Sequence, residues 1–316
     1  MTAKQRKTAG VGIAVLLGIC LIGANYGFYT SERRSNDIIA SEASQDGIEG
    51  PGLGSFMFSG AEAVRDNPVR VWYIAPEIDP ATTQILVVIP GAERDAESYR
   101  SDWEPLVEDR NVLVLVPEFP ETAYSDSAYN LGNVMNSDGN VRPRNEWTFV
   151  VIEALFDYVK ADVKSEAQHY NMFGHSAGAQ FVHRFMQFMD GNRVGTAVAA
   201  NAGWYTVPDE SNDFPYGLND SPLRDEDLGP AFASNLIVML GADDNDSEDD
   251  LLRHNEETDA QGANRLERGL NYYLVARHTA EDESLEFRWQ LRVVPGIDHD
   301  HTEMAKAAAD LLIEAS

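Results

Sequence analysis

The sequence is poor in cysteine and in basic residues. Its only cysteine is Cys20, so the rest of the chain can form no intramolecular disulfide and offers no thiolate for catalysis or metal binding. Only 24 Lys and Arg residues stand against 52 Asp and Glu residues, which gives a formal net charge of −28 at pH 7. A surface this negative repels nucleic acids and anionic lipids, so neither is an expected partner. Two explanations of the acidity, solubility and adaptation to a salty medium, remain open.

An uncharged, largely apolar run near the N-terminus sets that end apart. Lys4, Arg6 and Lys7 precede the run at residues 8–31, a pattern typical of an export signal or an uncleaved membrane anchor. We therefore expect residues 1–30 to be a signal peptide or anchor. The protein would then be exported and either secreted, periplasmic or held at the membrane by this segment alone. The alternative interpretation of the run is a buried core helix.

Two further regions follow along the chain. Residues 31–55 are polar and rich in Gly, Ser and Asp, which predicts a flexible linker. Residues 56–316 show neither an internal repeat nor a second linker, and with 43% hydrophobic residues in the chain a large buried core is possible. We expect them to form one catalytic domain.

Strand-like and helix-like patterns alternate within that domain, which predicts an α/β fold with a mostly parallel central sheet flanked by helices. Continuous β-branched runs are typical of strands buried on both faces. The expected strands are Val69–Ala75, Ile85–Ile89, Val112–Val116, Tyr170–Phe173, Gly195–Ala200, Leu236–Leu240 and Leu285–Val294. The expected helices are Trp147–Val163, Ala177–Met189, Leu266–Ala276 and His301–Glu314.

The sharpest motif is Gly174-His175-Ser176-Ala177-Gly178, between an expected strand and an expected helix. Strand, G-x-S-x-G and helix together are typical of the nucleophile elbow of α/β-hydrolases. The turn is so tight that side chains at the two glycines would collide with neighbouring backbone. The serine is forced toward strained dihedral angles that expose its hydroxyl. We therefore predict Ser176 to be a catalytic nucleophile.

A serine nucleophile needs a positioned base, and in this fold that base is a histidine on a late loop. Only His299 and His301 qualify among the seven histidines. Asp300 and Glu303 resemble a capping box, which would fix His301 on the surface of the last helix. His299 would precede that helix in a loop, and we predict it to be the base.

The orienting acid should follow the penultimate strand. Asp243 and Asp244 both follow the expected strand at 236–240, and the G-x-x-D spacing from Gly241 selects Asp244. Its carboxylate would accept the Nδ1–H of His299. The acidic residues continue to Asp250 with alternate spacing, which invites a calcium interpretation. The glycine and distal glutamate of an EF-hand loop are missing, so we expect a solvated acidic loop and no metal site.

An oxyanion hole needs two backbone N–H groups aimed at the developing negative oxygen, and each is typically worth ~3 kcal/mol. One should be Ala177, directly after the nucleophile. The second should come from the loop that follows the ILVVI run, where Gly91 permits a sharp turn and Ala92 comes next. Ala92 and Ala177 are thus the expected donors. No cofactor is implied.

Residues 69–316 resemble the α/β-hydrolase superfamily, and more narrowly bacterial serine esterases related to polyhydroxyalkanoate depolymerases. The resemblance implies ester hydrolysis through an acyl-enzyme, on a small-molecule or polymeric ester. It also implies that Trp204 forms an aromatic wall for the acyl chain, although a Trp that packs a loop fits equally well. The segments that carry it are IPGAERDAESYRSDW, GHSAG, NAGWYT, LGADDND, QGANRLERGLNYY and VPGIDHD with Met304.

Other functions remain as alternatives. A serine peptidase or amidase could use the same triad, but such enzymes usually add a cap or propeller domain, and the sequence has no room for one. An inert, membrane-tethered binding module would tend to lose a triad residue.

Four prolines between residues 201 and 235 also prevent a long amphipathic lid helix, so we expect no large cap domain.

Overall fold

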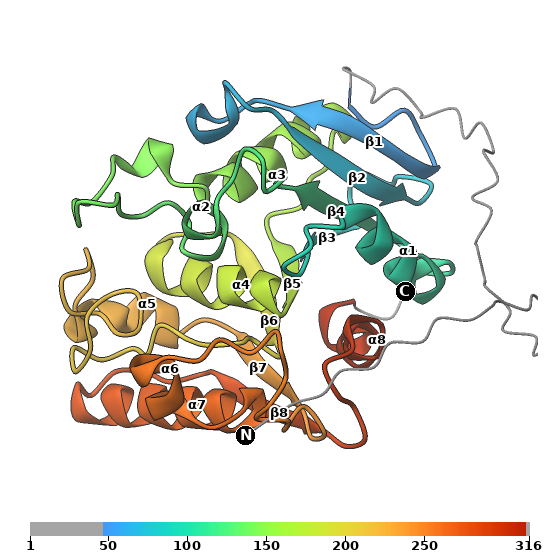
Figure 1. The fold of residues 1–316 in the computed structure, drawn as a ribbon. Helices are drawn as coiled ribbons and strands as arrows, with labels where there is room; N and C mark the ends of the chain where they lie inside the picture. The colour runs from blue at the N-terminus through green and yellow to red at the C-terminus, as the bar shows by residue number, and fades with distance from the viewer. Residues whose placement is uncertain (1–46, 314–316) are drawn as a thin grey trace, which may run out of the picture. The chain divides into compact units, whose positions relative to one another are not determined.

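The computed structural model describes residues 47–313, and the side chains of residues 225 and 226 are not described (Figure 1). The predicted signal or anchor at residues 1–30 lies outside this range, as does most of the predicted linker. Among residues 47–313, no helix combines the length and apolar character that crossing a bilayer requires.

Eight strands form a single sheet in the order β1-β2-β4-β3-β5-β6-β7-β8. The β1–β2 and β2–β4 pairs are antiparallel and the other pairs are parallel, which confirms the predicted mostly parallel sheet. The strands are β1 (Gly52–Phe58), β2 (Val69–Ala75), β3 (Gln84–Ile89), β4 (Val112–Glu118), β5 (Tyr170–His175), β6 (Val194–Ala200), β7 (Leu236–Gly241) and β8 (Gln290–Val294).

Helices cover both faces of the sheet, so the central strands alternate between two apolar cores (Figure 1). In β3, Leu86 and Val88 pack with α1 and α8, whereas Val87 and Ile89 belong to the core that includes α3, α4 and α7. The helices are α1 (Ala96–Val107), α2 (Asp126–Asn130), α3 (Val150–Val163), α4 (Ala177–Phe188), α5 (Gly229–Phe232), α6 (Glu256–Gln261), α7 (Arg265–Asp282) and α8 (His301–Leu312). Three short 3-10 turns are η1 (Glu62–Val64), η2 (Arg144–Glu146) and η3 (Asp225–Leu228).

The segment between β6 and β7 carries no lid helix. In residues 201–235 the structure has only η3 and the four-residue α5. This agrees with the expected absence of a large cap domain.

Two sequence-based boundaries were wrong. Strand β1 begins at Gly52, so residues 52–55 pair with β2 and do not belong to the predicted linker at 31–55. Strand β8 begins at Gln290, whereas Leu285–Val294 was expected. Residues 285–289 leave the sheet because Trp289 packs on Phe232 and donates its indole N–H to the Ala231 carbonyl at 2.7 Å.

Candidate active site

Ser176 occupies the turn between β5 and α4 in a conformation that side chains rarely adopt. Its φ is 56° and its ψ is −117°, where type II′ turns usually place glycine. The structure holds this conformation from both sides, because the Ser176 N–H donates to the Ala200 carbonyl and its own carbonyl accepts from Gln180. The backbone strain expected at this serine is therefore present.

The two glycines of the motif are required by close backbone contacts. A Cβ at Gly174 would lie 2.3 Å from the Gly178 carbonyl oxygen. A Cβ at Gly178 would lie 2.0 Å from the Ile89 carbonyl oxygen and 2.6 Å from that of Pro90. Gly174 therefore lets β5 pass close to the first turn of α4, and Gly178 lets that turn approach the end of β3; the collisions with backbone predicted from the sequence are present at both positions.

His299 and Asp244 meet Ser176 at the carboxyl ends of the parallel strands. The Nδ1 of His299 lies 2.8 Å from Asp244 Oδ2, and its Nε2 lies 3.0 Å from the Ser176 hydroxyl oxygen. Since Nδ1–H donates to the carboxylate, Nε2 carries the lone pair and can accept a hydrogen bond from the Ser176 hydroxyl. These three side chains therefore form one continuous hydrogen-bond chain.

Asp244 differs from its neighbour Asp243 in burial and in partners. Asp244 is only 2% exposed, whereas Asp243 points into solvent. Its second oxygen, Oδ1, faces the guanidinium of buried Arg265 at 3.3 Å, and Arg265 also pairs with Asp249 at 2.7 Å. Arg265 thus fixes the orientation of the carboxylate and leaves Oδ2 for His299.

Asn201 joins the loops that carry Asp244 and His299. It follows β6 with a φ of 52°, is 1% exposed, and accepts the Gly241 N–H through its side-chain oxygen at 2.7 Å. Its side-chain NH₂ donates to the Asp298 carbonyl at 3.1 Å. The N–H of Asp243 also donates to the Ile297 carbonyl. Hydrogen bonds therefore link the loop that carries Asp244 to the loop that carries His299.

Two adjoining pockets open beside Ser176. The tryptophan pocket has a volume of about 530 Å³ and is lined by Gln180, Trp204, Arg253 and Arg265 among others. The histidine pocket has a volume of about 290 Å³ and is lined by Tyr99, His175, His299 and His301 among others. Ser176, Ala92 and the 82%-exposed Leu251 line both pockets.

The predicted oxyanion donors lie where these pockets meet. Ala92 lines both pockets and Ala177 lines the tryptophan pocket, each together with Ser176. Ala177 is the first residue of α4, so its N–H has no acceptor within the helix. A carbonyl oxygen beside Ser176 can therefore reach both segments.

Trp204 lines the tryptophan pocket, is buried, and has two arginines near its ring. It is 4% exposed, with the Arg184 guanidinium 4.1 Å and the Arg253 guanidinium 5.0 Å from its ring. Arg184 is completely buried without a carboxylate partner among residues 47–313, and burial lowers its pKa to about 9. The indole is therefore held in place by cation–π contacts, and it lines the tryptophan pocket.

The histidine pocket contains an aromatic cluster built around His299. The His175 ring lies 4.6 Å from that of His299, and the Tyr99 hydroxyl lies 3.4 Å from His175 Nδ1. Burial lowers the pKa of His175 well below its usual value, and the positive charge of protonated His299 lowers it further. His175 is therefore a neutral neighbour of the base.

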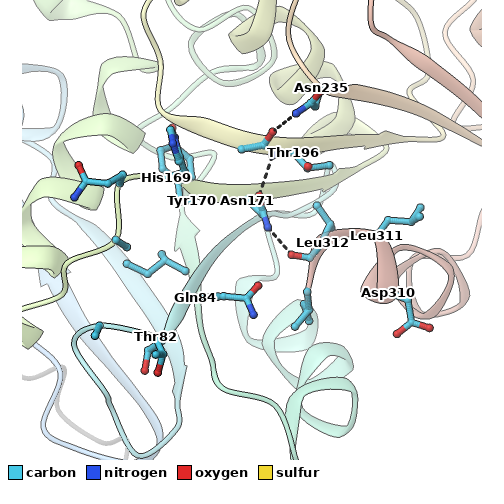
Figure 2. Close-up of a pocket in the computed structure, with 17 residues that line it drawn as sticks. Thr82, Gln84, His169, Tyr170, Asn171, Thr196, Asn235, Asp310, Leu311 and Leu312 are labelled. Atoms are coloured by element: carbon cyan, nitrogen blue, oxygen red, sulfur yellow. Dashed lines mark hydrogen bonds between the residues drawn. The ribbon is translucent and has the colours of Figure 1, made fainter. Parts of the chain in front are cut away.

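Another cavity, of about 510 Å³, lies at the opposite ends of the parallel strands (Figure 2). Its polar groups bind one another: Asn171 accepts the Thr196 N–H at 2.8 Å and donates to the Leu312 carbonyl at 2.5 Å. Asn235 likewise donates to the Gly195 carbonyl. No hydroxyl that lines this described cavity is hydrogen-bonded to His169, so it lacks the nucleophile–base pair found beside Ser176.

Sequence reasoning missed four residues that support the site. Arg265 and Asp249 orient the acid, Asn201 joins the loops, and Asp102 pairs with His301 at 2.6 Å. Arg265 lies in a segment that carries the family resemblance, which was the one available signal for it.

In residues 47–313 no group of three or more His, Cys, Asp or Glu side chains is arranged to hold a metal ion.

The fold is similar to that of several solved hydrolases. A poly(aspartic acid) hydrolase from Sphingomonas sp. KT-1 matches with a TM-score of 0.80 and 40% identity, over 83% of this chain and 99% of that chain. A poly(3-hydroxybutyrate) depolymerase from Bordetella parapertussis matches with a TM-score of 0.77 and 29% identity, over 83% and 90% of the two chains. No family profile and no curated protein matches the sequence.

A more distant similarity concerns the fold alone. A fluorophosphonate-binding serine hydrolase from Staphylococcus aureus matches with a TM-score of 0.54 and 17% identity, over 83% of this chain and 98% of that chain. The 40% identity to the first hydrolase extends over 99% of that chain and 83% of this chain. This chain therefore belongs to the α/β-hydrolase superfamily, among the bacterial esterases related to polyhydroxyalkanoate depolymerases.

Proposed function

We propose that this protein hydrolyses carboxylic esters through an acyl-enzyme on Ser176, with His299 as base and Asp244 as orienting acid. The observation that carries the proposal is the continuous chain of hydrogen bonds, 3.0 Å from serine to His299 and 2.8 Å from His299 to Asp244. These distances lie within the range that proton transfer requires. The buried carboxylate holds the imidazole in the tautomer that can accept the serine proton.

The reaction follows from this geometry. As Ser176 Oγ attacks the ester carbonyl, its proton moves to His299 Nε2, and the imidazolium that forms is stabilised by Asp244. The N–H groups of Ala177 and Ala92 would donate to the negative oxygen of the tetrahedral intermediate. His299 then gives its proton to the departing alcohol, and water reverses these steps to release the acid and restore Ser176.

Variants of the triad test this mechanism. Ser176→Ala should abolish labelling by a fluorophosphonate probe and hydrolysis of p-nitrophenyl butyrate. His299→Ala should lower kcat by ~10⁴-fold or more, because the three groups act as a unit. Asp244→Asn should lower kcat by ~10⁴-fold because the wrong imidazole tautomer is stabilised.

Asp243→Asn is the matched control for the acid. Asp243 is exposed and is the neighbour of Asp244 in the sequence. Its side chain is hydrogen-bonded to neither His299 nor Ser176. It should keep kcat within a few-fold of the parent enzyme. Equal losses in the two asparagine variants would contradict the role assigned to Asp244.

A second candidate is hydrolysis of amide bonds in an acidic polymer. Arg253 and Arg265 line the tryptophan pocket, although the chain as a whole carries a charge of −28. Arg265 is already paired with two carboxylates, whereas Arg253 has no ion pair among the described residues. Arg253 can therefore receive a substrate carboxylate. The similar hydrolase from Sphingomonas is named for poly(aspartic acid).

The two candidates predict different substrate preferences. If ester hydrolysis is the main activity, p-nitrophenyl butyrate should be cleaved faster than butyryl p-nitroanilide, and poly(aspartic acid) should remain intact. If the acidic polymer is the substrate, it should be shortened, and Arg253→Gln should lower kcat/KM on the polymer more than on p-nitrophenyl butyrate. Chain length can be followed by size-exclusion chromatography.

A further inference from the structure

A second Asp–His pair lies beside the proposed triad. His301 Nδ1 lies 2.6 Å from Asp102 Oδ2, and Asp102 Oδ1 accepts the Thr302 hydroxyl at 2.9 Å. The His301 ring also stacks on Tyr99, with ring centres 4.6 Å apart and planes at 14°. Both the carboxylate and the imidazole are therefore fixed in orientation.

The pair belongs to the pocket into which the alcohol of an ester must leave. His299 protonates the leaving oxygen in the proposed mechanism, so the leaving group lies on the His299 side of Ser176. His299 and His301 line the histidine pocket, and neither lines the tryptophan pocket. An ester that spans Ser176 therefore places its acyl part beside Trp204 and its alcohol part beside His301.

The hydrogen bonding of His301 selects the polarity of its ligand. In the neutral ring, Nδ1–H donates to Asp102, so Nε2 is an acceptor, and it has no partner among residues 47–313. Glu93 and Asp95 line the same pocket and also accept hydrogen bonds. The pocket thus offers several hydrogen-bond acceptors to the leaving group. These acceptors favour an ester whose alcohol part carries a further hydroxyl group that can donate a hydrogen bond.

We infer that His301, held by Asp102, binds a hydroxyl group on the alcohol part of the substrate, so that the enzyme prefers esters of diols and polyols. The inference rests on the proposed ester hydrolysis. His301 is here a substrate-binding residue, and Asp102 is a positioning residue that acts through it.

Two butyrate esters that differ in one hydrogen-bond donor test the preference. 2-Hydroxyethyl butyrate carries the hydroxyl, and 2-methoxyethyl butyrate keeps an oxygen at that position but cannot donate. The hydroxyl ester should have a kcat/KM about fivefold higher than that of the methoxy ester, the effect of one neutral hydrogen bond. Butyrate release can be followed for both esters by pH-stat titration.

Two variants separate binding from a structural role. His301→Phe keeps an aromatic ring on Tyr99 but has no Nε2, so the ratio of the two kcat/KM values should fall to about one. In Asp102→Asn the amide oxygen should remain toward the Thr302 hydroxyl, so its NH₂ would donate to His301 Nδ1. The proton would then move to Nε2, and the preference should vanish or reverse in favour of the methoxy ester.

The outcomes distinguish this inference from the proposed function. An enzyme that cleaves both esters at equal rates retains the proposed function but overturns the inference. Equal losses on both esters in the two variants, with an unchanged ratio, would assign His301 a structural role only. A protein that cleaves neither ester and is not labelled by a fluorophosphonate would overturn both proposals.

Discussion

Replacing Ser176 by glycine should leave the fold more stable than replacing it by alanine. Both changes remove the hydroxyl and its hydrogen bond to His299, so the loss of that contact is common to the two variants. They differ in the Cβ, which alanine keeps and glycine lacks. At a φ of 56° and a ψ of −117° the Cβ is the source of the strain.

The expected difference follows from two opposing terms. A residue held in such a sparsely populated region costs of order 1–3 kcal/mol, which the glycine variant recovers. Glycine also gains about 0.4–1 kcal/mol more chain entropy than alanine on unfolding, which acts against it. The net gain of the glycine variant over the alanine variant should be roughly 0.5–2 kcal/mol. At about 2–4 °C per kcal/mol, Tm should rise by a few degrees.

Urea denaturation and calorimetry of the two variants measure this difference. Ser101, exposed on α1, provides the control, because there the same two substitutions should give the opposite order: glycine destabilises a helix interior by about 0.5–1 kcal/mol relative to alanine. If the alanine variant of Ser176 is as stable as the glycine variant, the turn stores no strain that depends on the side chain. The physical account of the elbow would then be wrong.

Further predictions concern the rest of the domain. Gly178→Ala should lower the free energy of unfolding by about 3 kcal/mol or more, because the new Cβ would meet backbone that cannot move. Gly229→Ala should be tolerated, because its Cβ would lie 3.5 Å from the nearest atom. Urea unfolding of the two variants measures the difference. Burial lowers the pKa of His175 and His183 well below 6.5. Below pH 6.5 the unfolded chain therefore binds protons that the native state does not. The free energy of unfolding should fall by up to about 1.4 kcal/mol per pH unit for each histidine as the pH drops below 6.5, and it should show no such loss above pH 6.5. A flat stability between pH 7.5 and 5.5 would contradict this. Without a lid helix, the rate on a longer p-nitrophenyl ester should not jump where the ester forms micelles. Finally, we propose that the protein is exported. N-terminal sequencing of secreted or membrane fractions should find either an intact N-terminus or a cut between about residues 24 and 40. Full-length protein in the cytosol would argue against export.

The sequence singles out the three side chains that the structure joins by hydrogen bonds, because each of them is tied to a local pattern. The G-x-S-x-G motif between a strand and a helix identifies Ser176, and the spacing from Gly241 separates Asp244 from Asp243. His299 follows from its place before the last helix, which Asp300 does cap by accepting the Glu303 N–H at 3.0 Å. Each of these inferences needs only a few neighbouring residues.

The supporting contacts could not be predicted in this way, because they join distant parts of the chain. Asp102 and His301 are 199 positions apart, and only the packing of α1 against α8 brings them together. The sequence does carry a signal for α1 that was overlooked. Its buried residues Ala96, Tyr99 and Trp103 have helical spacing, although Pro105 within the helix obscures the pattern.

Strand β1 was missed for a different reason. It is an edge strand with two glycines, and its first residues are exposed, so composition alone resembles a linker. Only its antiparallel pairing with β2 reveals that it belongs to the sheet.

The position of β8 has a consequence for how activity and folding are related. This strand lies at the edge of the sheet and most of its residues are partly or fully exposed, yet the loop that follows it carries His299. Edge strands with exposed hydrogen bonds open at lower free energy than the core of a domain. Local opening of β8 would loosen one end of the loop that carries His299 while the elbow stayed folded. Enzyme activity is therefore a more sensitive reporter of local order at the C-terminal end than any measure of global unfolding.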